Sequence, residues 1–205
     1  MLFKFNRLHP PYPLTTKGQK RAVSRPEIYP MAELHVIGEI LDAVGFAEDG
    51  LSCVWALKYG GGWRVLEGSM SGQTQIAFSS SSINATFAHP IDIHLCTKSI
   101  QGWPKLQFHV WSSDSVGRMR IAGYGFCHVP TFPGEHMIEC AMWRPLGSAE
   151  QELRRWVLGS GIQVVDTDVI SAPFDRCRLN TVSVGKLRLR LAIILRHFDK
   201  FDVEY

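Results

Sequence analysis

The chain has 205 residues, of which 45% are hydrophobic and 20% charged, with a formal net charge of +3. This composition is typical of a globular protein with one domain or one domain and an arm, and no segment approaches the ~20 apolar residues of a membrane-spanning helix. Residues 1–30 hold six basic residues and one acidic residue, which leaves 16 basic and 18 acidic residues in 31–205. The folded part is therefore nearly neutral, which argues against a nucleic-acid partner, because phosphate recognition normally needs a basic face.

Residues 1–30 also contain five of the eleven prolines and show no sustained apolar period. This pattern predicts a disordered, basic, proline-rich N-terminal extension ahead of a domain spanning 31–205. A mitochondrial presequence and a basic membrane-surface tail are the alternatives. The prolines disfavour the presequence, because they interrupt the amphipathic helix that it requires.

The first predicted strands lie between residues 33 and 66. Residues 33–40 alternate in polarity, with Gly38 as the expected position of a β-bulge, and residues 51–59 form a second apolar run. Gly60-Gly61-Gly62 is expected to turn the chain into 63–66 as the hairpin partner of that run. The triple glycine lacks the Lys-Ser/Thr pair of a phosphate-binding loop.

Three strands are predicted between residues 89 and 130. Residues 91–96 and 105–111 alternate with a period of two, and 123–130 carry glycines that allow a bend or bulge. The segment 101–104 between the first two strands combines glycine, tryptophan and proline, which predicts a packed corner.

The C-terminal third of the chain is expected to hold two strands around one helix. Residues 137–143 form a strand, and Ser148 to Gln151 have the pattern of a helix capping box. The helix has an apolar stripe and is expected to pack across one end of the sheet. In residues 185–196 the leucines and Ile193 occupy one face and Lys186, Arg188 and Arg190 the other. The whole pattern predicts an all-β protein with one short helix, an antiparallel sandwich of about eight strands.

Residues with catalytic or metal-binding chemistry do not form a recognisable constellation in the sequence. Cys127 and His128 face opposite sides of one strand, and His94 and Cys96 share a face that is more typical of a packed or solvated surface. Calcium needs six to eight oxygen ligands, whereas only Asp166 and Asp168 lie close together in the chain. We therefore expect no enzyme activity, no metal and no cofactor.

The five cysteines, at positions 53, 96, 127, 140 and 177, include no Cys-x-x-Cys pair. Their odd number and wide spacing favour buried thiols in a reducing compartment, so a cytosolic location is expected.

Two features are candidate interaction sites. Lys186, Arg188 and Arg190 could meet anionic phospholipid headgroups, although alternating charge on a strand more commonly serves solubility and blocks edge aggregation. Trp111 lies on the polar side of its strand and is a candidate partner contact, with burial the competing explanation.

Three motifs carry a resemblance to a known family. Gly102-Trp103-Pro104, Val110-Trp111 and the run Gly123-Tyr124-Gly125-Phe126 through Pro130 resemble the signature of the B9 domain family, and the resemblance covers residues 31–205. It implies a C2-like β-sandwich that binds no calcium.

The same resemblance implies a non-enzymatic scaffold in a tectonic-like complex at the ciliary transition zone, which supports cilium assembly and limits diffusion of membrane proteins. The implied partners are other B9 domain proteins, tectonic-type transmembrane proteins, and gamma-tubulin or other centrosomal proteins. The implied locations are the cytoplasm, cytoskeleton, centrosome and cilium base. The alternative is a calcium-independent peripheral phospholipid-binding module in membrane trafficking.

Overall fold

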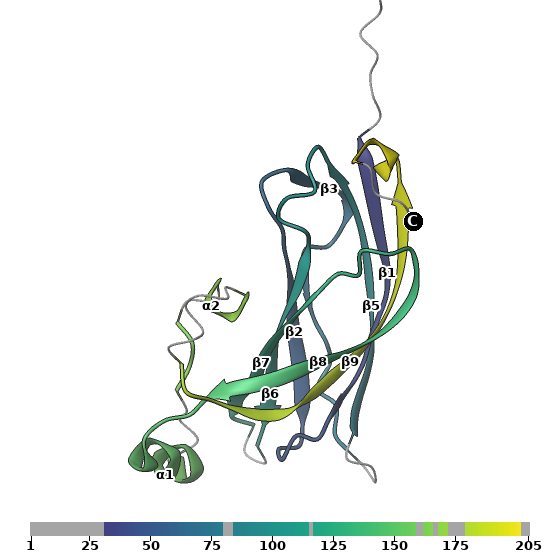
Figure 1. Ribbon diagram of the computed structural model, residues 1–205. Helices are drawn as coiled ribbons and strands as arrows, with labels where there is room; N and C mark the ends of the chain where they lie inside the picture. The colour runs from purple at the N-terminus through teal and green to yellow at the C-terminus, as the bar shows by residue number, and fades with distance from the viewer. Residues whose placement is uncertain are drawn as a thin grey trace, which may run out of the picture.

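The computed structural model describes residues 31–79, 84–114, 117–158, 162–165, 168–171 and 179–201, so the predicted extension 1–30 lies outside the described residues. Within these ranges the chain is almost entirely antiparallel β-structure (Figure 1). The elements are β1 (Ala32–Val44), β2 (Leu51–Lys58), β3 (Trp63–Gly68), β4 (Ser71–Gln73), β5 (Asn84–Thr97), β6 (Lys105–Ser113), β7 (Met119–His128), β8 (Gly134–Pro145), α1 (Ala149–Leu158), α2 (Asp168–Ser171), β9 (Thr181–Arg196) and a 3₁₀ turn, η1 (Phe198–Phe201).

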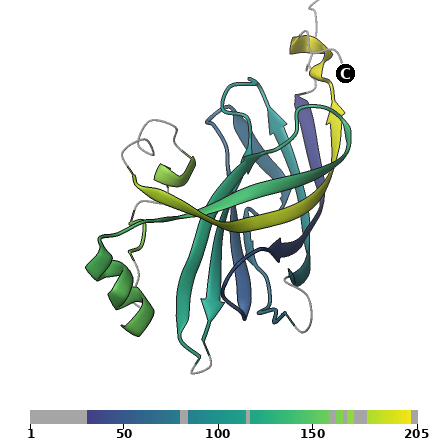
Figure 2. The same ribbon diagram turned by 60° about the horizontal axis from the view of Figure 1, so that its bottom comes forward.

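The strands form one curled sheet with the order β3-β5-β1-β9-β8-β7-β6-β2-β4. Curling places β3, β5 and β1 in one layer and β7, β6, β2 and β4 in the other, and the long strands β8 and β9 pass from one layer to the other (Figures 1 and 2). The predicted all-β antiparallel sandwich is confirmed, with nine strands in the described part of the chain in place of about eight.

The core lies between the two layers and follows the period of two expected of half-buried strands. Along β9 the residues at alternate positions from Leu187 to Leu195 are buried, and the buried Leu34 and Val36 of β1 and Ile93 of β5 lie beside them in the same part of the sheet. The facing layer contributes the buried side chains of Cys53, Trp55, Leu57, Leu106, Phe108 and Val110. The buried cysteine thiols are free where the structure describes them.

Gly38 does not form the predicted bulge. The register of β1 shifts between Ile40 and Asp42, whereas Gly38 pairs regularly with Ile91 and Leu191. A Cβ at Gly38 would overlap the carbonyl oxygen of Arg190, so glycine is needed here for close approach of two backbones.

The predicted hairpin between β2 and β3 is also wrong. β3 pairs with β5, and β2 pairs with β4 and β6, so the three glycines carry the chain from one layer to the other. The amide of Gly60 donates a hydrogen bond to the carbonyl oxygen of Gly102 at 2.9 Å, which joins this turn to the corner after β5.

The predicted corner at 101–104 is confirmed. Trp103 packs edge-on against Trp63, with ring centroids 5.1 Å apart, and its Nε1 donates to the carbonyl oxygen of Val129 at 2.8 Å. Gly102 has a φ of 69°, and a Cβ there would lie 2.5 Å from Gly60. This corner therefore joins the turns that follow β2, β5 and β7 at one end of the sandwich.

The capping box of α1 is present, since the Ser148 amide donates to Gln151 Oε1 at 2.9 Å and the Gln151 amide lies 3.4 Å from Ser148 Oγ. The apolar stripe of α1 is expected from the sequence to pack across the sheet. Two of its residues, Leu153 and Val157, are instead 60% and 58% exposed. α1 projects from the body beside the end of β8 (Figure 2).

Candidate interaction surfaces

The basic residues predicted on β9 lie in a row of ion pairs that joins β9 to its neighbours β1 and β8. Lys186 Nζ lies 2.7 Å from Glu139 of β8, Arg188 pairs with Asp42 of β1, and Arg190 pairs with Glu39 of β1 and more distantly, at 3.7 Å, with Glu135 of β8. We call these seven residues the charged ladder. Its three cations and four carboxylates make it slightly acidic.

The ladder follows directly from strand register. Asp42 pairs with Arg188 and Glu39 with Arg190 across β1 and β9, and the carboxylates of β8 reach β9 diagonally. Directly opposite residues on antiparallel strands are close enough for such contacts. The hydrogen bond from Lys186 lowers the pKa of Glu139, so this carboxyl stays ionised in the folded protein.

Lys186 and Arg188 also line a groove of about 460 Å³ near the ends of β1 and β9. Binding of phospholipid at Lys186, Arg188 and Arg190 stays a prediction. The ladder's own carboxylates oppose it, because they neutralise the charges that would attract an anionic surface.

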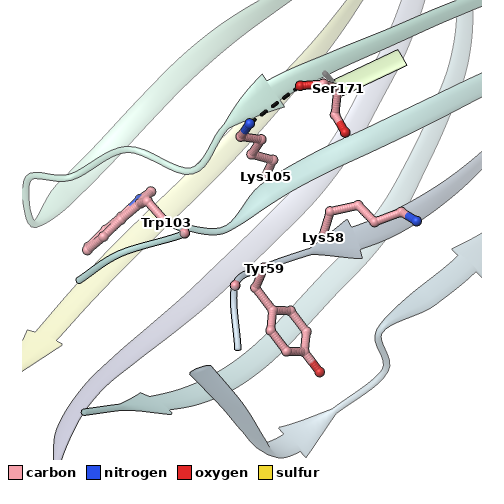
Figure 3. Close-up of a pocket in the computed structure, with 7 residues that line it drawn as sticks. Lys58, Tyr59, Trp103, Lys105 and Ser171 are labelled. Atoms are coloured by element: carbon pink, nitrogen blue, oxygen red, sulfur yellow. Dashed lines mark hydrogen bonds between the residues drawn. The ribbon is translucent and has the colours of Figure 1, made fainter. Parts of the chain in front are cut away.

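A second candidate surface lies on the outside of the layer that contains β6 and β2, in a pocket of about 180 Å³ lined by Lys58, Tyr59, Trp103, Lys105 and Ser171 (Figure 3). Lys58 and Lys105 are directly opposite each other in the pairing of β2 with β6. Lys58 Nζ lies 2.8 Å from Asp168 of α2, and Lys105 Nζ lies 3.5 Å from the carbonyl oxygen of Ser171. This pair was not predicted, because the two lysines are far apart in the chain and only the strand register brings them together.

Burial and the two lysines lower the pKa values of two histidines on the same face of the sheet. Burial and, to a lesser degree, Lys58 lower the pKa of His109, and burial and Lys105 lower the pKa of His128. Lys105 also lies 5.8 Å from the ring centroid of Phe126. Both lysines therefore contribute positive potential to this face of the sheet.

Trp111, the predicted partner contact, is half-buried against a small cluster formed by Ile121, Tyr124 and Ile170. Ile170 anchors α2 to the sheet, and Tyr124 Oη accepts a hydrogen bond from the amide of Val164 at 3.1 Å. Trp111 thus supports the segment that carries α2. A direct role in partner binding stays a prediction.

The family-signature glycines at 123 and 125 allow close packing of β7 on β8 and β9. A Cβ at Gly123 would lie 2.8 Å from Val184, and one at Gly125 would overlap Met142 Sδ. The register shift between Val110 and Trp111 lies beside Gly123, as expected of a bulged strand.

Reactive groups do not converge in the part of the chain that the structure describes. Burial raises the pKa of the Cys53 thiol, and a contact with Cys140 together with burial raises the pKa of Cys127. Among the described side chains, no three His, Cys, Asp or Glu residues are placed to hold a metal ion. Asp166, one of the two neighbouring aspartates that are too few for a calcium site, lies outside the described residues, and Asp168 pairs with Lys58.

Comparison with known proteins identifies the family. The model of the family described as "Ciliary basal body-associated, B9 protein" matches residues 34–194. This chain belongs to the B9 family. B9 domain-containing protein 2 of Bos taurus is 49% identical and that of Homo sapiens 48%, each over 174 residues that make up 85% of this chain and 99% of the relative. The predicted resemblance is thereby confirmed.

More distant proteins also match this B9 chain. B9 domain-containing protein 1 of Mus musculus is 26% identical, over 83% of this chain and 85% of its own length. A solved structure, a C2 domain of plant Extended Synaptotagmin 1, aligns with 15% identity and a TM-score of 0.40, covering 80% of this chain and 95% of that one. None of the helices that the structure describes is long and apolar enough to cross a membrane.

Proposed function

We propose that this chain is a non-enzymatic scaffold of the cilium base, which joins other B9 domain proteins and tectonic-type transmembrane proteins into a transition-zone complex. In that complex it would support cilium assembly and the barrier to diffusion of membrane proteins. The observation that carries the proposal is the match to the B9 family, which spans both layers of the sandwich.

The charged ladder is the surface that we assign to another B9 domain protein. Fixed cations and carboxylates in alternation favour one register and one partner over others, because misaligned like charges are costly. The ladder is exposed at both ends, with Lys186 and Glu139 each 58% exposed at one end and Arg190 and Glu135 52% and 66% exposed at the other. Gamma-tubulin and other centrosomal proteins remain proposed partners without an assigned surface.

Copurification of the full chain with B9 domain-containing protein 1 tests this assignment. The double variant Lys186→Glu/Glu139→Lys keeps an ion pair on the surface but inverts its polarity, so a complementary partner meets like charges. Because residue 139 also lies directly opposite Arg188, a thermal unfolding curve must show that the variant is folded before its binding is compared. We expect the variant to bind at least tenfold more weakly, which corresponds to a loss of about 1.4 kcal/mol or more in binding free energy. The matched control is Glu150→Lys/Arg154→Glu, which inverts the exposed ion pair of α1. Unchanged binding of the ladder variant would remove the assignment.

The second candidate is a calcium-independent peripheral phospholipid-binding module. The groove beside Lys186 and Arg188 is the observation in its favour. Flotation of the full chain with vesicles of phosphatidylcholine and phosphatidylserine tests it, and loss of flotation in Lys186→Gln/Arg190→Gln would support it.

A further inference from the structure

The lysine pair of β2 and β6 is an unfavourable arrangement that the fold only partly compensates. Like charges directly opposite on neighbouring strands destabilise a sheet. The ion pair of Lys58 with Asp168 has side chains 40% and 75% exposed, and exposed pairs of this kind contribute little. The contact of Lys105 with the Ser171 carbonyl oxygen is long for a hydrogen bond, at 3.5 Å.

The pocket beside this pair has the size and lining of a site for one small anion. Its volume of about 180 Å³ is well below the roughly 300–1,000 Å³ of pockets that hold drug-sized ligands. Lysine ammonium groups are flexible point charges that bind phosphate well. In Figure 3 the two side chains diverge from adjacent strands, with Lys105 directed toward Ser171, so binding of one anion requires both ammonium groups to leave their contacts with Asp168 and Ser171.

The surroundings of the pocket favour an anion presented by a membrane. The turns after β2, β5 and β7 meet at this end of the sandwich, joined by the Gly60–Gly102 and Trp103–Val129 hydrogen bonds. These turns expose Tyr59, Ile100 and Phe132, at 36%, 45% and 64%. Exposed apolar side chains beside a cationic pocket suit the boundary between phosphate headgroups and acyl chains.

We propose that Lys58 and Lys105 form a binding site for the phosphate group of a phosphorylated lipid headgroup, and that Asp168 of α2 is an internal competitor for it. Asp168 already provides Lys58 with a carboxylate, so a phosphate must displace that contact to bind both lysines. α2 itself stays in place, because Ile170 is fully buried. The site is separate from the charged ladder and does not depend on the proposed scaffold function.

The test is flotation of the full chain with phosphatidylcholine vesicles that contain phosphatidylinositol phosphate. Because each basic residue near an anionic surface contributes about 1 kcal/mol, Lys58→Gln/Lys105→Gln should bind at least tenfold more weakly. Arg118→Gln/Arg154→Gln, which removes two exposed cations elsewhere, should bind like the wild type. Equal loss in both double variants, or no loss in the first, would overturn the site.

Asp168→Asn supplies a gain of function that misfolding cannot imitate. Removal of an exposed counter-ion should tighten vesicle binding roughly two- to fivefold. Unchanged or weaker binding would overturn the role of Asp168 as competitor. Inorganic phosphate distinguishes the two sources of the anion: calorimetric binding of inorganic phosphate that is lost in Lys58→Gln/Lys105→Gln, without flotation of the wild type on the vesicles, would assign the site to free phosphate and overturn the lipid.

Discussion

Arg188 and Asp42 form a two-point ion pair across β9 and β1, in which Arg188 Nε donates to Asp42 Oδ1 at 2.7 Å and Nη2 donates to Oδ2. Asp42 is buried, at 7% exposure, and lies just after the register shift in β1. The pair therefore fixes the irregular part of β1 to β9. Burial of Asp42 also makes this central pair of the charged ladder different from the exposed pairs at its ends.

Arg188→Ala should destabilise the fold by about 1–3 kcal/mol, because it leaves the Asp42 carboxylate buried without its partner. This cost is below that of breaking a fully buried ion pair, since the Arg188 side chain is itself 39% exposed. Lys186→Ala, in an exposed pair, should cost less than about 1 kcal/mol. Urea unfolding of both variants measures the difference. Equal costs would contradict the structural role of Asp42.

Gly38→Ala should be strongly destabilising, by about 3 kcal/mol or more, since the added Cβ meets the backbone of β9, which cannot move aside. Gly125→Ala should cost less, because its Cβ overlaps a side-chain atom, Met142 Sδ, and its nearest backbone atom, the Ala141 carbonyl oxygen, lies 3.1 Å away. Gly61→Ala, with nothing within 4 Å, should lie within about 0.5 kcal/mol of the wild type. Thermal unfolding of the three variants gives the order, and a mild Gly38→Ala would contradict the close approach of β1 and β9.

Trp103→Phe should cost about 1–3 kcal/mol, because it leaves the carbonyl oxygen of Val129 without its donor while most of the aromatic packing is kept. Trp103→Ala should cost about 3–5 kcal/mol, since the contact with Trp63 is lost as well. Calorimetry of both variants checks the values. The same loss in both would mean that packing contributes little at this corner.

His109 should make stability depend on pH in the mildly acidic range. Burial and Lys58 lower its pKa in the folded protein from the ordinary 6.5, so below that value the unfolded chain binds more protons. Stability should therefore fall as pH decreases from 6.5 toward the folded pKa. Urea unfolding across this range should show a shallower fall for His109→Gln, and His136→Gln serves as a control for loss of an imidazole. Identical profiles for wild type and His109→Gln would contradict this account.

The sequence predicts strands well because one buried face imposes a period of two, as in residues 187–195. It predicts the capping box for a similar reason, since the contact between Ser148 and Gln151 is local. Pairings depend on contacts between distant residues, so neither the placement of β3 beside β5 nor the opposition of Lys58 and Lys105 can be derived from spacing. The carboxylates facing Lys186, Arg188 and Arg190 were missed for the same reason. The family resemblance added the C2-like type of sandwich to these local patterns, but it specified none of these pairings.

We propose that this B9 domain protein acts at the cilium base through partners that bind its outer surface. A tagged full-length chain in ciliated cells, imaged beside a transition-zone marker, tests it most directly. We expect the fluorescence of the tagged wild type to concentrate at the base of the cilium, and that of Lys186→Glu/Glu139→Lys to lose this concentration. A wild-type protein that never gathers at the ciliary base would contradict the claim.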